Sequence, residues 1–537
     1  MAQSSVTEAG ANTAEAFWKS IAWGMSLESA TVGVLVVTLV ILYFLSLARE
    51  RKHLPPGPLP WPVVGNLVDL ASGGLPHIFL TKLASKYGGL MYLRLGSKPC
   101  IVISSAAAAK EMFRKSNEAN FSSKNKGLFI EIISDNYRTL AHSPYGPHWR
   151  QLRRFVTSEL FSPKRHASYQ NAREDELRNM MRVLSEDCAK GDALKNLKSW
   201  FRELNANLMT KMLFNKSGDA CRKERMELEQ SFEAILTTSM KSAIGDYIPS
   251  LRFITKLQGV DRAFKDLRDL WIQIGGKFME LEKRRTSRAD DHKQFQPDFV
   301  DLILAEPLDN GKPMSDTTLA LQIMEFLFAG TDTGATVSEW AMAEVIGNPQ
   351  VLKQAREELD AVVGGDRLMQ ESDIPNLPFL EAIVKEAFRL HPPVAVTLNR
   401  LAVEPAEAWG YTIPAGSQLT VNMYAIHRDP EVYENPDEFN PQRFIDRPEV
   451  NHLSGFDSYE LIPFGLGRRM CPGANLGNTM VSLMLGNLIH SFDWSLPNEQ
   501  SLESFRRDNK EEKFGVMSTR KEPLVLVARP RDNVASC

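Results

Sequence analysis

The sequence is poor in cysteine and has no excess of charge of either sign. Only five of its 537 residues are cysteines, and their wide spacing argues against both a disulfide framework and a Cys-x-x-Cys zinc site. The scattered thiols fit a reducing compartment. The formal net charge is −3, so nothing in the composition suggests nucleic acid as a partner. Apolar side chains make up 43% of the chain, which suffices for one large globular unit.

Long uncharged apolar runs are also scarce, and the one that stands out lies near the N-terminus. Residues 30–48 carry no charge over 19 positions, enough to cross a bilayer as a helix. Basic residues follow the run and acidic residues precede it, so the positive-inside rule keeps the large C-terminal part cytosolic. We therefore expect four parts: a lumenal tail of residues 1–29, a transmembrane anchor of residues 30–48, a basic and proline-rich hinge of residues 49–58, and one large domain of residues 59–537.

A single cysteine stands in a glycine-framed loop before a predicted helix at 474–490. Gly467 and Gly473 permit tight turns, and the positive end of the helix favours the thiolate of Cys471. Arg469 adds a fixed positive charge suited to a carboxylate, and Phe464 can shield the sulfur from water. A buried structural cysteine is the plainer alternative for an isolated Cys-Pro-Gly.

Residues 464–473 resemble the signature of the cytochrome P450 (haem-thiolate) monooxygenases, Phe-x-x-Gly-x-Arg-x-Cys-x-Gly, at every fixed position. The resemblance implies a mostly α-helical fold with small β-sheets that binds haem b (iron protoporphyrin IX), with Cys471 as axial ligand and Phe464 and Arg469 beside the cofactor. It also implies O2 as a substrate, NADPH-derived electrons from a cytochrome P450 reductase, and a single-pass protein of the endoplasmic reticulum membrane whose catalytic domain faces the cytosol.

A long helix is predicted over residues 316–346, with Ser315 as its N-cap. Its middle reads Ala-Gly-Thr-Asp-Thr over residues 329–333, where small side chains would let a flat cofactor approach. A mid-helix threonine usually bonds back to a carbonyl one turn earlier. The resemblance instead assigns Thr333 to the iron-bound oxygen species and Asp332 to proton delivery.

A glutamate and two arginines form a second group of candidate residues. Glu386 and Arg389 are spaced i, i+3 on a predicted helix, which alone would indicate a surface ion pair. Residues 439–444 match a later arginine segment of the family. The resemblance therefore predicts a buried network of Glu386, Arg389 and Arg443 that holds the cysteine loop in place.

Further cofactor contacts are predicted on another helix and a later strand. Trp149 and Arg153 share one helical face, and the resemblance assigns both to a haem propionate. Arg400 is another candidate for a propionate, although Asn399 replaces the proline of many plant relatives and leaves the partner of Arg400 open. Basic residues near the predicted proximal face of the haem (Arg150, Arg154 and Arg468) are either reductase contacts or ordinary solvated charge.

The substrate is expected to be a small lipophilic secondary metabolite. Residues 145–148 and 160–165 resemble plant phenolic-ester and flavonoid hydroxylases, which favours hydroxylation of a phenylpropanoid or flavonoid-like compound. Residues 157–166 and 522–527 also resemble amino-acid N-hydroxylases that form oximes, and this alternative stays open. Two other classes remain: a reductase-independent hydroperoxide isomerase or dehydratase, and a non-catalytic haem-binding membrane protein. Glu325 is either a contact for a polar substrate group or a structurally paired glutamate.

Overall fold

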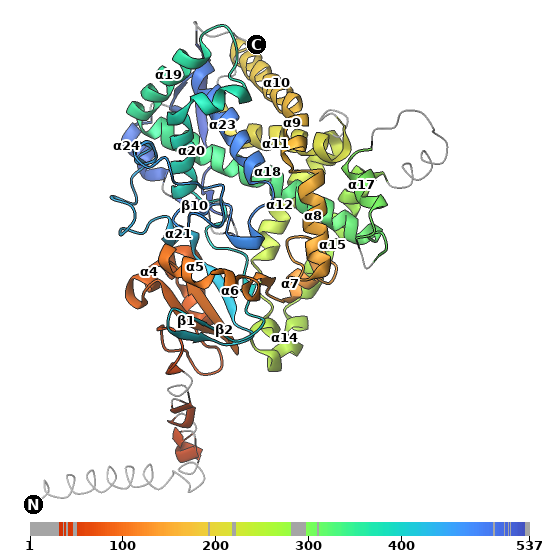
Figure 1. Cartoon of the computed structure of the whole chain (residues 1–537), viewed down its shortest axis with the longest axis vertical. Coiled ribbons are helices and arrows are strands. Elements are labelled where there is room, and N and C mark those ends of the chain that lie inside the picture. The colour runs from red at the N-terminus through yellow and green to blue at the C-terminus, as the bar shows by residue number, and fades with distance from the viewer. Residues whose placement is uncertain are drawn as a thin grey trace, which may run out of the picture. The chain divides into compact units, whose positions relative to one another are not determined.

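The computed structural model describes residues 32–35, 37–38, 41–43, 45–46, 51–191, 194–216, 222–280, 297–308, 311–497, 500–509, 511–513, 515 and 517–531 (Figure 1). The chain divides into two units, Met1–Pro56 and Gly57–Cys537. Part of the predicted anchor, residues 30–48, lies outside the described residues, which include only 32–35, 37–38, 41–43 and 45–46 of it. Within the described ranges, no helix combines the length and the apolar character needed to cross a bilayer.

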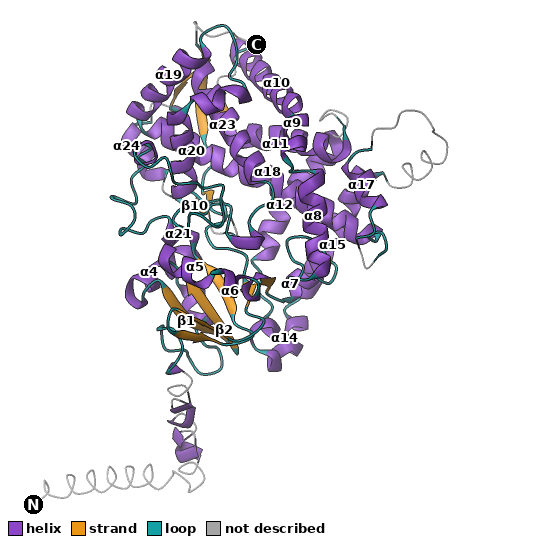
Figure 2. Cartoon of the chain, viewed as in Figure 1, coloured by secondary structure: helices purple, strands orange, loops and turns teal. Residues whose placement is uncertain are grey.

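The second unit is mostly helical with small sheets, as the sequence predicted (Figure 2). Its longer helices are α4 (Pro76–Tyr87), α8 (Pro147–Glu159), α10 (Gln170–Ala189), α11 (Leu197–Phe214), α12 (Arg222–Ser239), α15 (Val260–Met279), α18 (Asp316–Gly347), α19 (Pro349–Val363), α20 (Pro378–Leu390) and α23 (Ala474–Ser491). Its shorter helices include α3 (Leu67–Ser72), α5 (Ala106–Met112), α6 (Lys115–Glu118), α7 (Leu128–Ile133), α9 (Pro163–Ser168), α13 (Ile244–Tyr247), α14 (Arg252–Leu257), α17 (Phe299–Ala305), α21 (Met423–Ile426), α22 (Gln442–Ile445) and α24 (Leu502–Asp508).

The largest sheet has five strands in the order β1-β2-β8-β5-β3, and all its pairs are antiparallel except β2–β8. Its strands are β1 (Leu90–Leu95), β2 (Lys98–Ile103), β3 (Ser123–Lys124), β5 (Arg400–Leu401) and β8 (Gln418–Val421). Three smaller sheets pair β4 (Leu194–Asn196), β12 (Val525–Pro530) and β9 (Phe492–Ser495); β6 (Ala406–Ala408) and β7 (Tyr411–Ile413); β10 (Glu512–Lys513) and β11 (Thr519–Arg520).

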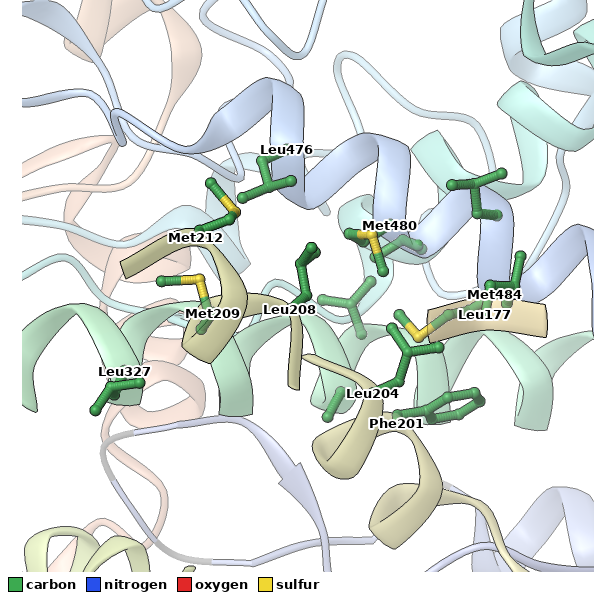
Figure 3. Packing of buried hydrophobic residues seen from close by; sticks show 14 of the residues in the cluster. Leu177, Phe201, Leu204, Leu208, Met209, Met212, Leu327, Leu476, Met480 and Met484 are labelled. Carbon is green, nitrogen blue, oxygen red and sulfur yellow. The ribbon is translucent and has the colours of Figure 1, made fainter. Parts of the chain in front are cut away.

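Helix α18 crosses the interior of this unit and carries part of the candidate site. It begins as the sequence predicted, since the Ser315 side chain accepts the N–H of Thr318, and it ends at Gly347, directly before the Asn348-Pro349 stop signal. Its 32 residues span about 48 Å at helical rise. Most of its residues are buried, because α11, α15 and α23 pack against it, and its buried polar side chains contact neighbouring segments. Figure 3 shows side chains from the buried hydrophobic cluster, with Leu204 and Met209 from α11, Leu327 from α18 and Met480 from α23. Each such buried side chain contributes about 1.5–3 kcal/mol of burial free energy.

Candidate active site

The cysteine loop is shaped by two glycines in the left-handed region. Gly465 has φ +77° and Gly467 has φ +62°. The N–H of Cys471 then donates to the carbonyl of Phe464 at 2.9 Å, which closes the loop beneath the start of α23. The sequence correctly predicted a special conformation at Gly467. The prediction of a special conformation was wrong for Gly473, whose φ is −93°, although a Cβ there would lie 3.3 Å from the Phe161 ring.

The thiol of Cys471 is subject to opposing influences. Although part of the residue is accessible to solvent, dense packing around the sulfur makes desolvation the largest of them, and burial raises the pKa of the Cys471 thiol. The N–H of Gly473 at the start of α23 and the charge of Arg153 lower this pKa in part. The predicted helix-end effect is therefore present but outweighed, and a bound cation is what would deprotonate this sulfur fully.

Phe464 packs against α23 and against α20, the helix that carries Glu386 and Arg389. Its ring centroid is 4.9 Å from that of Phe388 in α20. A Cβ built at Gly477, in the first turn of α23, would lie 3.4 Å from the Phe464 ring. The aromatic side chain is thus wedged between α20 and α23, at the base of the cysteine loop.

Four basic side chains converge near this loop. Burial and the neighbouring charge of Arg400 lower the pKa of Arg469 to about 9, with Arg153 acting in the same direction. Burial lowers the pKa of Arg400 to about 10. The pKa of Lys124 falls well below its ordinary value through burial and the charges of Arg400 and Arg469. The Nη1 atom of Arg400 is buried and has no partner among the described residues. Such a cluster is suited to a dianionic ligand.

Arg469 and Trp149 are held in place by backbone carbonyls from a distant part of the chain. The Arg469 guanidinium donates to Ser122 O at 2.6 Å and also to Leu140 O and Ser143 O. The Trp149 indole donates to Leu140 O at 3.2 Å, and the guanidinium of Arg469 lies 4.3 Å from the centroid of the Trp149 ring. The two predicted propionate contacts therefore share one carbonyl and stack on each other.

Arg400 has the partner that the sequence left open. Its Nη2 donates to the carbonyl of Leu466 at 2.6 Å, and its guanidinium lies 4.7 Å from the centroid of the Phe113 ring. The preceding Asn399 accepts the hydroxyl of Thr420 at 2.7 Å. An asparagine at 399 is thus accommodated by a hydrogen bond to β8, and Arg400 braces the cysteine loop directly.

The structure brings Glu386, Arg389 and Arg443 together in the interior. Both oxygens of Glu386 accept from Arg389, at 2.7 and 2.9 Å, and Oε1 also accepts from Arg443 Nε at 3.0 Å. The N–H of Asn440 donates to the same oxygen at 2.8 Å. The side chains of Glu386 and Arg389 are 0% exposed, so this is a buried network and not a surface ion pair.

A buried histidine that the sequence did not reveal links this network to the cysteine loop. Arg389 Nη1 donates to the carbonyl of His427 at 2.8 Å, and the His427 imidazole accepts the N–H of Ile462 at 2.9 Å. Burial and the charges of Arg389 and Arg428 lower the pKa of His427 to about 3, so it remains the neutral acceptor that this geometry needs. No sequence motif marked His427, because its role depends on a contact across 35 residues.

Glu118 of α6 is a second residue that the sequence did not reveal. Its side chain is 3% exposed and accepts the N–H of Arg468 at 2.7 Å as well as the Arg468 Nε. It also accepts the hydroxyl of Ser122 at 3.1 Å. Arg468, considered from the sequence for partner docking, therefore forms an ion pair within the chain although its side chain is 44% exposed; Arg150 and Arg154 are exposed as well.

The middle of α18 presents an accessible stripe beside a buried acid. Ala329 is exposed and Thr333 is half-buried, one turn apart, and the Thr333 hydroxyl donates back to Ala329 O at 2.6 Å. Asp332 is buried, with one oxygen accepting from Arg202 of α11 and the other without a partner among the described residues. A Cβ at Gly330 would lie 2.5 Å from the sulfur of Met209, so this glycine makes room for α11 as well as the predicted cofactor.

These residues fit the haem that the sequence predicted. The donor set for iron is the single thiol of Cys471, and the described part of the chain contains no other grouping of His, Cys, Asp and Glu able to hold a metal ion. Two propionates would satisfy the basic cluster and the unpartnered Arg400 nitrogen. The small side chain of Ala329 leaves room for a flat ring beside α18.

Comparison with known proteins agrees with this arrangement. The sequence profile of the family Cytochrome P450 matches residues 55–527. Similar curated proteins include flavonoid 3'-monooxygenase of Petunia hybrida, 38% identical with 92% of this chain and 96% of that protein covered, and flavonoid 3',5'-hydroxylase of Solanum melongena, 36% identical with 94% and 96% covered. Melianol synthase of Azadirachta indica is 36% identical, with 91% and 96% covered.

Solved structures show the same fold at lower sequence identity. A zebrafish cytochrome P450 structure with progesterone has a TM-score of 0.69 and 24% identity, and covers 85% of this chain and 99% of that one. The family profile spans most of the chain, and the plant relatives cover more than nine-tenths of it at over 30% identity. The chain therefore belongs to the cytochrome P450 family and is a haem-thiolate monooxygenase of the plant type.

Proposed function

We propose that this monooxygenase hydroxylates a flavonoid or a closely related phenolic compound. The observation that carries the proposal is the agreement of two plant flavonoid hydroxylases with this chain over more than nine-tenths of its length. The unaltered Thr-Asp-Thr centre of α18 favours carbon hydroxylation over oxime formation and over chemistry that needs no reductase. The substrate is expected to bind beside the accessible stripe of α18 formed by Ala329 and Thr333.

Each side chain of the site has a distinct task in this proposal. Cys471 would ligate the iron of the haem, and Phe464 would keep water from the sulfur. Trp149, Arg153, Arg400 and Arg469 would hold the propionates, and Lys124 would join them although no sequence motif singled it out. Bound haem supplies the activation of O2, with electrons that a reductase delivers from NADPH. The protein supplies orientation, exclusion of water and protons.

Proton supply is assigned to Asp332 and Thr333. One carboxylate oxygen of Asp332 is buried and has no partner among the described residues, and the other accepts from Arg202. The Thr333 hydroxyl now donates to Ala329 O. Rotation about χ1 would release this donor toward the accessible stripe, where the hydroxyl could hold a proton beside the bound substrate. A positioned acid of this kind contributes about 10²–10⁴-fold to rate.

The substrate proposal is tested by product formation in membranes from cells expressing the chain with a plant cytochrome P450 reductase. We expect flavonoids bearing a single B-ring hydroxyl to gain one oxygen from labelled O2, in an NADPH-dependent reaction that Cys471→Ser abolishes. A panel of phenolic esters and aromatic amino acids distinguishes the alternatives. Turnover of amino acids to oximes, or turnover without NADPH, would overturn the proposal.

The remaining parts of the proposal concern partners and location. A hollow of about 440 Å³ beside the cysteine loop is lined by Arg150 and Arg153 together with Phe456 and Met470, and we assign it to reductase docking. Arg150→Glu should raise the reductase concentration needed for half-maximal turnover, with little effect on the substrate KM.

We also propose that residues 30–48 anchor the chain in the endoplasmic reticulum with residues 59–537 in the cytosol. Protection of the C-terminal part from protease added outside sealed microsomes would contradict that topology.

A further inference from the structure

Three side chains on one stripe of α18 bind a single loop of the chain. Thr318, Gln322 and Glu325 follow the i, i+4, i+7 pattern and therefore share a helical face. Their contacts with the loop of residues 134–143 are Thr318 Oγ1 to Asp135 Oδ2 at 2.5 Å, Leu140 N to Gln322 Oε1 at 2.8 Å, Ala141 N to Glu325 Oε1 at 2.9 Å and His142 Nδ1 to Glu325 Oε2 at 3.2 Å. We call these three helix residues the strap.

The strapped loop contains an unfavourable backbone conformation. Asp135, Asn136 and Tyr137 have φ of +48°, +58° and +63°, so three successive residues other than glycine lie in the left-handed region. Asp and Asn tolerate this region, but for a residue such as Tyr137 it costs about 1–2 kcal/mol. Two kinds of contact offset this cost. The N–H of Tyr137 donates to Ser134 Oγ at 3.0 Å within the segment, while Thr318 binds Asp135 at the start of the turn and Glu325 binds residues 141 and 142 after it.

The same loop carries the carbonyls that orient the cofactor-binding side chains. Leu140 O accepts from both Trp149 and Arg469, and Ser143 O accepts from Arg469. The N–H of Leu140 is bound by Gln322, and the next residue is bound by Glu325. A displacement of residues 139–143 would therefore move the acceptors of Arg469 and Trp149 together.

Glu325 is the strap residue with the most contacts. Its side chain is 16% exposed, and besides the loop it accepts from Gln322 Nε2 at 3.1 Å. Burial alone would raise the pKa of Glu325, but the hydrogen bonds from His142, Thr139 and Ala141 and the His142 charge outweigh it and lower that pKa. The carboxylate is thus ionised and fully engaged, which leaves it unsuited to a direct substrate contact.

We propose that Glu325 is a positioning residue that fixes residues 139–143 to α18 and thereby sets the orientation of Arg469 and Trp149 toward the haem propionates. This inference rests on the proposed cofactor contacts of those two side chains. It assigns to the N-terminal half of α18 a task distinct from that of Asp332 and Thr333: the strap ends one turn before Ala329, where the accessible stripe begins.

The test compares Glu325→Ala, Glu325→Gln and His142→Ala with a matched control on the same helix. Glu344 pairs with His391 at 2.8 Å, and these side chains are 17% and 9% exposed, so Glu344→Gln removes an equivalent pair far from the loop. Two quantities are measured on the full-length protein: the rate of haem release in the absence of substrate, and backbone amide hydrogen exchange of peptides covering residues 134–143 before and after removal of haem.

We expect Glu325→Ala to release haem about tenfold faster than wild type, equivalent to about 1.4 kcal/mol. Glu325→Gln and His142→Ala should be intermediate, because each retains the bond from the N–H of Ala141. Exchange of the loop should accelerate in all three variants and stay unchanged in Glu344→Gln. Unaltered exchange of the loop, or equal acceleration of haem release in Glu344→Gln, would overturn the inference.

Failure of the proposed function gives a different result. A wild-type protein that binds haem but hydroxylates no flavonoid would refute the substrate and leave the strap intact. Should Glu325→Ala not fold, the two milder variants decide the question. Exchange measured on the haem-free protein tests the strap independently of any cofactor.

Discussion

Replacing Glu386 by glutamine would disrupt the buried network that supports the cysteine loop. The carboxylate accepts two bonds from Arg389, one from Arg443 and one from the N–H of Asn440, at 2.7–3.0 Å. Glutamine retains the size but not the charge, and its amide group would direct N–H bonds at a guanidinium that also only donates. Arg389, 0% exposed, would then carry an uncompensated charge.

The expected cost follows from that burial. Breaking a buried ion pair by removing one partner destabilises a protein by about 3–5 kcal/mol. The entropy of unfolding is about 1 kcal/mol per kelvin for a unit of this size, so the Tm should fall by about 3–5 °C. The loss should concentrate at the cysteine loop, because Arg389 holds the carbonyl of His427 and His427 holds Ile462.

The assay measures Tm by calorimetry and thiolate ligation by the carbon monoxide difference spectrum. Glu358→Gln is the matched control: Glu358 caps the start of α20 by accepting the N–H groups of Phe379 and Leu380 at 2.8 and 2.9 Å. This variant should lose about 1 kcal/mol and keep the thiolate signal. If Glu386→Gln retained both its Tm and its thiolate spectrum, the assignment of the network to support of the loop would be refuted.

Three further changes test other parts of the site. Asp332→Asn should lower turnover about 100-fold with an unchanged substrate dissociation constant, measured by stopped-flow and by spectral titration. Because the folded state keeps His427 neutral, with its pKa lowered from 6.5 to about 3, the unfolded chain gains a proton first as pH falls and stability declines. His427→Gln should therefore reduce the slope of unfolding free energy against pH by about 1.4 kcal/mol per pH unit between about pH 6 and pH 4, measured by denaturant titration. Gly467→Ala, at φ +62° and with a Cβ 2.8 Å from a Glu118 oxygen, should cost about 1–2 kcal/mol and weaken haem retention, whereas Gly473→Ala should be tolerated; equal effects of the two would contradict the loop geometry.

Sequence rules predicted the ends of a helix or strand well where the residues that cause them lie in the same short segment. The Ser315 cap and the Asn348-Pro349 stop fix α18 to within one residue of the predicted 316–346. The hairpin of β1 and β2 also has a local cause. Lys98 and Pro99 pair with β1 directly after the turn because Gly96, at φ +63°, allows a turn of only two residues.

Contacts between distant segments were not predictable from pattern alone. Glu118 reaches Arg468 across 350 residues, and the carboxylate of Glu325 meets His142 across 183. Neither acid differs in its local sequence from a solvated glutamate, so only the folded chain reveals its partner. The raised pKa of the Cys471 thiol is a similar case. A helix N-terminus is visible in the sequence, but the amount of protein packed around the sulfur is not.

The three carbonyls that grip Arg469 lie 347, 329 and 326 positions upstream of it. At synthesis rates of about 5–20 residues per second, those acceptors leave the ribosome roughly 15–70 s before Arg469, which donates to them in the folded chain. The contacts of Arg469 therefore form late, and the cofactor pocket is complete only after most of the chain has been synthesised. We expect the yield of haem-loaded protein to depend on how well the earlier segments are kept from aggregating until then.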